Sequence, residues 1–258
     1  MKAPETIHAF WCRFPSNANF GDALTPWIIR KITGHYPVFS WPAEPVQKYI
    51  VMGSIIQYAQ ENCTVWGAGI MSRDDTISPK AKLVMVRGPL TRRRALECGV
   101  DCPDVYGDPA LLLPMLYQPL TVGIKTQIGV IPHYFDKLKV AARWKPSARL
   151  LLIDIQQRVE TVVNQITSCE YIVSSSLHGL IVANAYGLPS LWVEFDSKLI
   201  GDGSKFRDYF LSIGQEPYEP VQLGRGPIDP DKLVERMLPP RQADLNSLLE
   251  ACPFRKNE

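Results

Sequence analysis

Short apolar runs that stop at glycine or at small polar residues recur along this chain, and they alternate with helix-like segments. Residues 49–52 lead directly into Gly53 and Ser54, and residues 64–66 lead into a Gly-Ala-Gly turn. Runs bounded in this way predict strands, and strands that alternate with helices at this spacing predict βαβ units. Such units require right-handed crossovers and a mostly parallel sheet, so the sequence predicts the α/β fold class.

The same periodicities predict the elements of the whole chain. Glycines at 34, 99 and 187 follow helical patterns, and glycine readily adopts the left-handed conformation that ends a helix. The expected strands span residues 7–12, 49–52, 64–66, 82–86, 127–131, 150–153, 171–173 and 191–194. The expected helices span residues 23–33, 89–98, 110–113, 156–168, 176–186 and 204–211.

A break in composition predicts where the chain divides. Pro114 and Pro119 interrupt the alternating pattern, which then restarts. A chain of 258 residues with 46% apolar content can form one large or two modest α/β domains. We therefore expect an N-terminal domain over residues 1–118 and a C-terminal domain over residues 119–258. The last forty residues are rich in proline, and they predict a wrap-around segment with one or two short helices.

Composition also sets expectations about partners and location. No apolar run approaches the roughly 20 residues of a membrane span, and residues 1–5 lack the apolar core of a signal peptide, so a cytoplasmic location is expected. The net charge of +2 is too small to indicate nucleic-acid binding. The six cysteines are scattered, and the close pair Cys98 and Cys102 has no second pair or nearby histidine, so no metal site is expected.

Residues 171–189 contain a candidate anion site. A buried strand, a turn of three serines (Ser174, Ser175 and Ser176) and a helix follow one another, and His178 lies in the first turn of that helix. The free backbone N–H groups and the dipole of a helix N-terminus favour an anion. The alternative interpretation is an ordinary capped helix with a surface or half-buried histidine.

Ligands of parallel α/β sheets bind beyond the carboxyl ends of the strands, so the residues that follow each strand are candidates for function. In chain order they are Asn17, Asn19, Gly21, Asp22, Gly53, Ser54, Gly67, Gly69, Arg87, Gly88, Gly107, Asp108, His133, Ser174, Ser175, Ser176, His178, Asp196 and Lys198. The planar donor fork of Arg87 suits a carboxylate or a phosphate. Asp22 and Asp108 fit either catalysis or helix capping.

Six motifs occur in an order that resembles the polysaccharide pyruvyl transferases, and most closely the branch that decorates bacterial exopolysaccharides. The motifs are Asn19-Phe-Gly-Asp22, Trp66-Gly-Ala-Gly69, Val86-Arg-Gly-Pro-Leu-Thr91, Gly107-Asp-Pro-Ala-Leu-Leu112, Ile131-Pro-His-Tyr134 and Ser175-Ser-Leu-His-Gly-Leu180. The resemblance extends over residues 19–195. The chain departs from the family at Met52-Gly-Ser54, where many members have a run of glycines, and it is on the short side.

The resemblance implies a glycosyltransferase-B-like fold, in which two Rossmann-like domains with mostly parallel sheets face each other across a cleft. It also implies phosphoenolpyruvate as a co-substrate and the transfer of its pyruvyl group to two hydroxyls of a sugar as a ketal, with release of phosphate. The donor would be bound mainly by the C-terminal domain. Arg87 and His178 match the donor contacts of the family.

The chemistry of the donor suits these residue types. Phosphoenolpyruvate carries a carboxylate and a phosphate, and its site needs fixed cations and a helix N-terminus. Arg87, His178 and the three serines supply that set, and Lys198 is expected to add a cation, with Lys205 and Arg207 less favoured. His178 would hold the phosphate or donate a proton, and Asp22 or Asp108 would take the proton of the acceptor. No step requires a cofactor or a metal.

The acceptor is expected to be a saccharide bound by the N-terminal half. Its candidate contacts are Asn17, Asn19, Gly53 and Ser54, and Trp11, Trp27, Trp41 and Trp66 could stack on sugar rings or belong to the core. An acceptor linked to lipid would place the enzyme at the inner face of the membrane. Two other functions stay open at this point. They are a nucleotide-sugar glycosyltransferase of the same architecture and a catalytically silent protein that binds sugar or phosphate.

Overall fold

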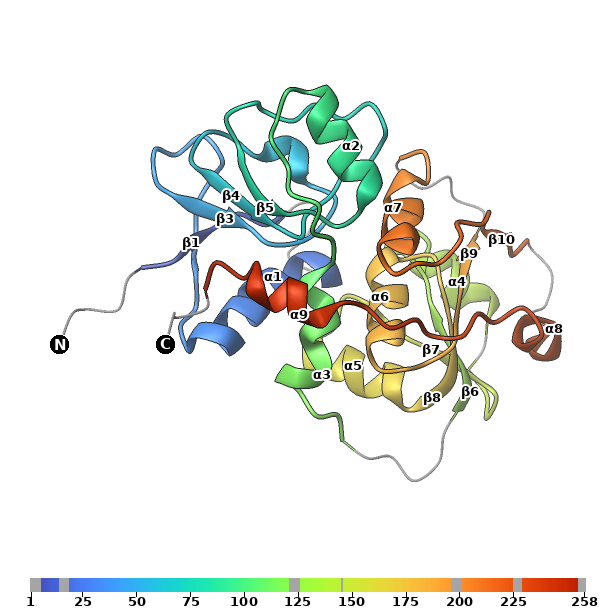
Figure 1. Cartoon of the computed structure of the whole chain (residues 1–258). Coiled ribbons are helices and arrows are strands. Elements are labelled where there is room, and N and C mark those ends of the chain that lie inside the picture. The colour runs from blue at the N-terminus through green and yellow to red at the C-terminus, as the bar shows by residue number, and fades with distance from the viewer. Residues whose placement is uncertain are drawn as a thin grey trace.

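Two parallel β-sheets organise the molecule, one in each half of the chain (Figure 1). The computed structural model describes residues 6–13, 19–120, 126–144, 146–195, 201–224 and 229–254. Every pairing between neighbouring strands of the two sheets is parallel. The α/β class that the alternating pattern predicts is therefore confirmed.

The first sheet has the strand order β2-β1-β3-β4-β5. Its strands are β1 (His8–Ala9), β2 (Val38–Phe39), β3 (Lys48–Ile50), β4 (Cys63–Trp66) and β5 (Lys82–Met85). The other elements of this half are α1 (Phe20–Thr33), η1 (Ile56–Tyr58), α2 (Pro89–Glu97), η2 (Pro109–Leu112) and α3 (Leu113–Leu116). Gly34 ends α1 with a φ of 80°, as the pattern predicts, but the helix begins at Phe20 and so includes Gly21 and Asp22.

The second sheet has the order β10-β9-β8-β6-β7. Its strands are β6 (Thr126–Ile131), β7 (Leu150–Leu152), β8 (Cys169–Ser174), β9 (Ser190–Glu194) and β10 (Val221–Gln222). The helices of this half are α4 (Lys137–Arg143), α5 (Val159–Thr167), α6 (Leu177–Ala185), α7 (Ser204–Ser212), α8 (Pro230–Val234) and α9 (Leu245–Glu250). The edge strands β2 and β10 are absent from the prediction, because two residues are too few to show a period.

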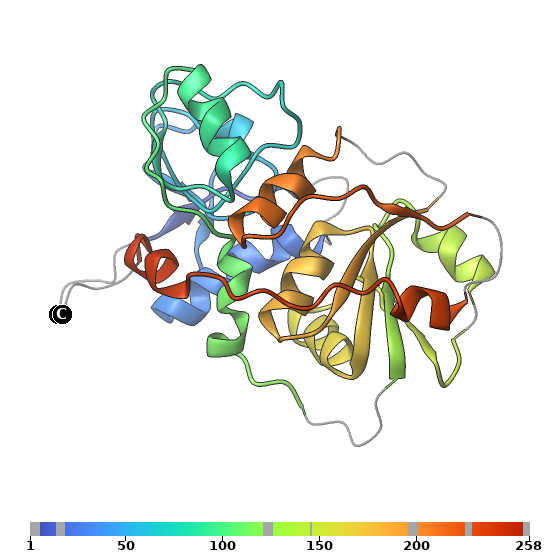
Figure 2. The same ribbon diagram turned by 45° about the vertical axis from the view of Figure 1, so that its right-hand side comes forward.

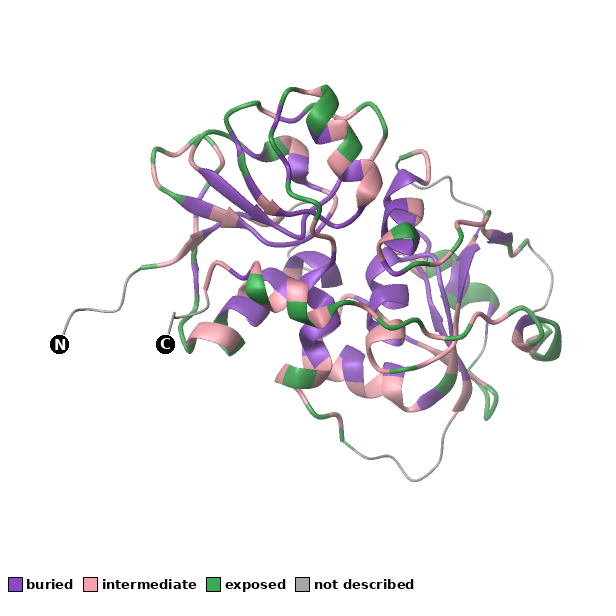
Figure 3. Ribbon diagram, viewed as in Figure 1, coloured by how far each residue is buried: buried purple, intermediate pink, exposed green. Residues whose placement is uncertain are grey.

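One hydrophobic core joins the two halves. The same cluster of buried residues contains Trp66 and Met85 of the first sheet and Ile131 and Ile172 of the second. Figure 3 shows buried residues in both sheets and in α1, α6 and α7, where the halves meet. Across this junction, Trp27 of α1 donates a hydrogen bond from Nε1 to Glu160 at 2.8 Å. The shared core holds the strand ends of the two sheets in a defined relation.

The C-terminal segment runs back along the outside of the molecule. Figures 1 and 2 both show it passing from α8, beside the second sheet, to α9, beside α1. Trp66 Nε1 donates a hydrogen bond to the carbonyl of Leu248 at 3.1 Å, and the ring of Phe254 lies 4.7 Å from that of Tyr49. The end of the chain therefore covers the first sheet, while the domain boundary at residue 118 stays a prediction.

Candidate active site

The candidate site lies where residues that follow the strands of both sheets come into contact. A Cβ built on Gly21 would lie 2.2 Å from Cε1 and Nδ1 of His178, so the imidazole rests directly on the first turn of α1. Oδ2 of Asp108 is 3.5 Å from Nε2 of the same ring. The expectation that the strand-end residues of both halves lie together is therefore correct for these positions.

The turn of three serines holds His178 in place. Ser174 Oγ lies 2.8 Å from the carbonyl oxygen of Ser176 and accepts a hydrogen bond from the backbone N–H of that residue at 3.0 Å. Gly179 allows this, because a Cβ there would lie 2.4 Å from Ser174 Oγ. The turn orients the start of α6, whose first N–H groups have no intrahelical partner. The N-termini of α1 and α6 thus both lie next to the imidazole of His178.

Asp108 caps η2 and also faces the imidazole of His178. Its Oδ1 accepts a hydrogen bond from Ala110 N at 2.9 Å and so caps η2. Its Oδ2 is buried, faces His178 and has no hydrogen-bond partner in the described part of the chain. A buried carboxylate oxygen without a partner is costly unless it binds a proton donor. This oxygen is therefore placed to bind a proton on the imidazole.

Asp22 lies in the first turn of α1 and is almost fully buried. Burial raises the pKa of its carboxyl to about 6, although His178, the side-chain amide of Asn19 and the backbone of Cys12 each lower it. Asn19 Nδ2 donates a hydrogen bond to Asp22 Oδ2 at 2.8 Å. A Cβ built on Gly53 would lie 3.6 Å from Asp22 Oδ1. The carboxyl can thus exchange a proton near neutral pH.

Arg87 is fully buried, and its guanidinium is bound within the protein. Nε and Nη2 each lie 3.1 Å from Asp208 Oδ2, and Nη1 donates a hydrogen bond to Ser54 Oγ at 2.9 Å. Nη2 also donates a hydrogen bond to the carbonyl of Ile70 at 2.6 Å. Arg87 therefore joins β5 and the loop after β3 to α7. Its role in binding the pyruvyl donor stays a prediction, because in this geometry the N–H groups of its guanidinium bond other residues of the protein.

Asp208 is a residue of the site that the sequence analysis did not predict. Besides Arg87, its carboxylate accepts hydrogen bonds from the backbone N–H and the hydroxyl of Thr91 at 3.0 and 2.7 Å. A Cβ on Gly88 would lie 2.1 Å from the carbonyl oxygen of Asp208, so this approach requires glycine. The signal in the sequence was an acidic residue between the aromatic residues Phe206 and Tyr209 of one helix.

A second polar group surrounds the serine turn. Ser175 Oγ accepts a hydrogen bond from His133 N at 2.8 Å. Burial, with a smaller effect of Lys205, lowers the pKa of His133 to about 4, so this imidazole is neutral at physiological pH. Lys205, in the first turn of α7, is itself buried. The strand ends after β6 and β8 and the start of α7 are therefore neighbours.

The remaining expected residues divide into two groups. Asn19 and Ser54 lie at the site, bonded to Asp22 and Arg87, and Gly53 packs beside Asp22. Asn17, Asp196 and Lys198 lie outside the described residues. The described residues Asn19, Asp22, Gly53, Ser54 and Arg87 are thus linked by contacts, whereas their roles in catalysis and in donor and acceptor binding stay predictions.

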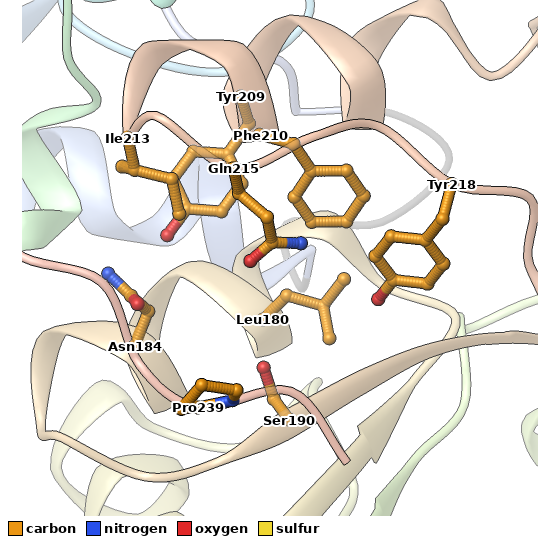
Figure 4. A pocket seen from close by; sticks show the side chains of 9 residues that line it. All are labelled: Leu180, Asn184, Ser190, Tyr209, Phe210, Ile213, Gln215, Tyr218 and Pro239. Carbon is orange, nitrogen blue, oxygen red and sulfur yellow. The ribbon is translucent and has the colours of Figure 1, made fainter. Parts of the chain in front are cut away.

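A small pocket on the other face of α6 is separate from this site. Figure 4 shows its lining, which comes from α6, α7 and the C-terminal segment. The lining residues are Leu180, Asn184, Ser190, Tyr209, Phe210, Ile213, Gln215, Tyr218 and Pro239. Leu180 and Asn184 lie two and six positions after His178, and hence on another side of the helix. No carboxylate, imidazole or cation lines the pocket, so we do not assign it to the chemistry.

Within the described ranges, no helix is long and apolar enough to cross a membrane. The same ranges contain no group of three or more His, Cys, Asp or Glu side chains that could hold a metal ion.

A two-sheet α/β chain with an imidazole 3.5 Å from one buried carboxylate and electrostatically coupled to a second has the elements of an acid–base enzyme. Comparison with known sequences gives the family. A sequence model of the polysaccharide pyruvyl transferases matches residues 12–197. The chain therefore belongs to the polysaccharide pyruvyl transferase family, as the six motifs predict, and this family consists of transferases.

Two sequence relatives and one solved structure are similar to parts of the chain. The chain is 33% identical over 217 residues to the uncharacterized protein L143 of Acanthamoeba polyphaga mimivirus, covering 79% of this chain and 74% of the relative. It is 26% identical over 206 residues to the succinoglycan biosynthesis protein ExoV of Rhizobium meliloti (strain 1021), covering 77% of this chain and 62% of ExoV. Among solved structures, the functionally uncharacterized KP1_0663 of Klebsiella pneumoniae subsp. pneumoniae NTUH-K2044 aligns with a TM-score of 0.46 at 10% identity, over 80% of this chain and 87% of that one.

Proposed function

We propose that this protein transfers the pyruvyl group of phosphoenolpyruvate to two hydroxyls of a saccharide, forming a ketal and releasing phosphate. The observation that carries the proposal is the buried cluster of Asp22, His178 and Asp108 at two helix N-termini, in a chain of the pyruvyl transferase family. Helix N-termini favour an anion such as phosphate, and the cluster supplies an acid and a base. We propose a glycosyltransferase-B-like arrangement in which this cluster faces a cleft between the halves.

The first half of the reaction adds one hydroxyl. Protonated His178 donates a proton to C3 of the enol, which becomes a methyl group and leaves a cationic C2. A sugar hydroxyl adds to C2, and Asp22 takes the hydroxyl proton. Asp108 acts through His178, because its Oδ2 faces Nε2 and stabilises the protonated ring. The geometry favours Asp22 as the base, since both oxygens of Asp108 are already directed to Ala110 and His178.

The second half closes the ketal. The bond between C2 and the phosphate oxygen breaks, and its electron pair leaves with phosphate, near the N-termini of α1 and α6. The second hydroxyl then adds to C2, and the departing phosphate takes its proton. Asp22 returns the proton of the first hydroxyl to His178, which replaces the one given to C3. The steps use only side chains of the protein, so chelators such as EDTA should leave the rate unchanged.

The acceptor side is proposed to lie beyond β1 and β2. The rings of Trp11, Phe39 and Trp41 form a series in which neighbouring centroids are 5.1 and 5.0 Å apart, and Arg13 lies 4.5 Å above Phe39. Trp41 is half exposed. Trp27 and Trp66, in contrast, belong to the core. Aromatic faces with a nearby polar group suit a sugar ring, and Cys12 connects Trp11 to Asp22 through its backbone hydrogen bond.

An assay of purified protein with phosphoenolpyruvate and a panel of galactosides, glucosides and mannosides tests the proposal. The expected product is heavier than its acceptor by one pyruvyl ketal, with phosphate released in equal amount. Phosphate release that does not depend on any acceptor, or transfer from a nucleotide sugar in place of phosphoenolpyruvate, would contradict it. His178→Ala separates two roles, because loss of an acid lowers kcat whereas loss of a phosphate ligand raises the KM for phosphoenolpyruvate.

A further inference from the structure

Lys205 is a buried cation that lacks the partners a buried charge normally has. Its side chain lies in the first turn of α7 and is 7% exposed. Nζ forms no hydrogen bond or ion pair with any residue in the described ranges, and it lies 5.4 Å from the centroid of the Phe206 ring. Removing an ammonium group from water is unfavourable unless a partner replaces the water.

The other two buried cations of the described chain are fully paired. Lys48 donates hydrogen bonds from Nζ to the carbonyls of Pro42, Glu44 and Val46 at 3.3, 2.7 and 2.8 Å. Arg87 pairs with Asp208 and bonds two further oxygens. The fold thus satisfies a buried charge where that charge only supports the structure. Lys205 is the exception, and its position in the site suggests a ligand.

Arg87 and Glu194 are the charged groups that act on Lys205. Burial and, to a smaller extent, Arg87 lower the pKa of its ammonium to about 8, whereas Glu194 opposes this shift. Lys205 in turn acts on His133, whose backbone binds Ser175 in the turn before α6. The charge of Arg87 is balanced by Asp208, but no described carboxylate forms an ion pair with Lys205. An anion that enters beside the serine turn would therefore meet one unbalanced fixed cation.

We propose that Lys205 binds an anionic group of the pyruvyl donor, its carboxylate or its phosphate, next to the serine turn. This inference rests on the proposed function and adds a residue that the sequence motifs did not favour. An incoming anion would supply the partner that Nζ lacks, whereas Arg87 would first have to release Asp208. Lys205 is then the donor-binding cation, and Arg87 is the residue that fastens α7 in place.

The substitution Lys205→Met keeps the length of the side chain and removes its charge. The ligand-free variant should melt at the same temperature as the wild type or above it, because it no longer buries an unpaired ammonium. Its KM for phosphoenolpyruvate should rise about 10- to 100-fold, as expected for the loss of one charge-assisted hydrogen bond. Lys205→Arg should recover part of the affinity.

Arg207→Met is the matched control on the same helix. Its guanidinium donates hydrogen bonds to the carbonyl of Asp202 at 2.8 Å and to Glu219 at 2.6 Å, and positions two residues apart do not share a helix face. This variant should bind phosphoenolpyruvate as the wild type does. The same loss of affinity in both variants would overturn the assignment, because any charge change on α7 would then suffice.

Thermal-shift titrations with phosphoenolpyruvate, inorganic phosphate and pyruvate complete the test. Loss of the response to phosphate in Lys205→Met would assign Nζ to the phosphate, and loss of the response to pyruvate would assign it to the carboxylate. An unchanged response of the variant to phosphoenolpyruvate would overturn the role of Lys205 and leave the proposed function standing. A wild-type protein that phosphoenolpyruvate neither stabilises nor reacts with would overturn the donor itself, and this inference with it.

Discussion

Nε2 of His178 and Oδ2 of Asp108 lie 3.5 Å apart, and neither atom has a hydrogen-bond partner in the described part of the chain. Asp108 precedes η2 in the first half of the chain, while His178 begins α6 in the second. Two buried polar atoms without hydrogen bonds lower the stability of the fold, and such atoms are often found at functional sites. A proton on the imidazole would join them by a charge-assisted hydrogen bond, so the pair is suited to hold that proton for catalysis.

Asp108→Asn should lower kcat by roughly 100-fold, because the amide cannot stabilise a protonated imidazole as a carboxylate does. The Asn side chain can keep the cap on η2, since its Oδ1 can still accept from Ala110 N. The melting temperature should therefore change little. Steady-state kinetics with melting curves check both parts, and wild-type turnover in the variant would remove Asp108 from the mechanism.

The rate should fall in acid because Asp22 must be ionised to act as a base. With its pKa raised to about 6 by burial, kcat/KM should drop about tenfold for each pH unit below 6. Asn19→Ala should move this limb to higher pH, since it removes a hydrogen bond that lowers the pKa of Asp22. If the acidic side of the kcat/KM profile stays at the same pH in Asn19→Ala, the group that titrates there is not Asp22.

The same raised pKa has a consequence for stability. A carboxyl whose pKa is higher in the folded than in the unfolded state stabilises the fold while it is protonated. For Asp22 this contribution is fully present below the unfolded pKa of 3.8, and it is lost as the pH rises through the folded pKa of about 6. Asp22→Asn should therefore exceed the wild type in unfolding free energy at pH 7 by up to about 3 kcal/mol. The difference should disappear near pH 3.5, which denaturant titrations at both pH values can test.

Gly21→Ala should displace His178 and reduce activity by at least about 100-fold, because the added Cβ would lie 2.2 Å from the ring. Gly224→Ala is the control, since a Cβ there meets nothing within 4 Å. Activity and melting temperature should be measured for both. Full activity of Gly21→Ala would show that the imidazole works from another position.

Asp208→Ala should destabilise the fold by about 3–5 kcal/mol, because it leaves the buried guanidinium of Arg87 without its counter-ion. Glu61→Ala breaks the exposed pair with Lys80, whose two side chains are about two-thirds exposed, and should have no measurable effect. Chemical denaturation compares the two variants. Equal stability would mean that Arg87 has another partner in solution.

Trp41→Ala should raise the KM for the saccharide acceptor several-fold without changing the KM for phosphoenolpyruvate, if the ring series beyond β1 and β2 binds sugar. Tyr36→Ala provides the comparison, because this exposed tyrosine precedes β2 and lies at the opposite end of that strand from Trp41. An acceptor KM that changes equally in both variants would exclude a specific role for Trp41.

The local pattern predicts most of the fold. The glycine that follows α1 and the alternation of apolar runs with helices place both sheets correctly, because backbone preferences and periodicity act within a few residues. The strands expected over residues 7–12 and 150–153 are shorter in the structure, as β1 and β7, because a strand extends only where a neighbour pairs with it. The helix α4 was also missed, since its seven residues carry a single buried side chain.

By itself, the sequence determined the α/β class, the family and several strand-end residues of the candidate site, since each of these depends on residue type and order along the chain. Only the tertiary structure decided that His178 faces Asp108, that Arg87 is bound to Asp208, and that Lys205 is buried without a partner. These relations join residues of different sheets and helices. They depend on how the two halves pack on their shared core, which no local periodicity encodes.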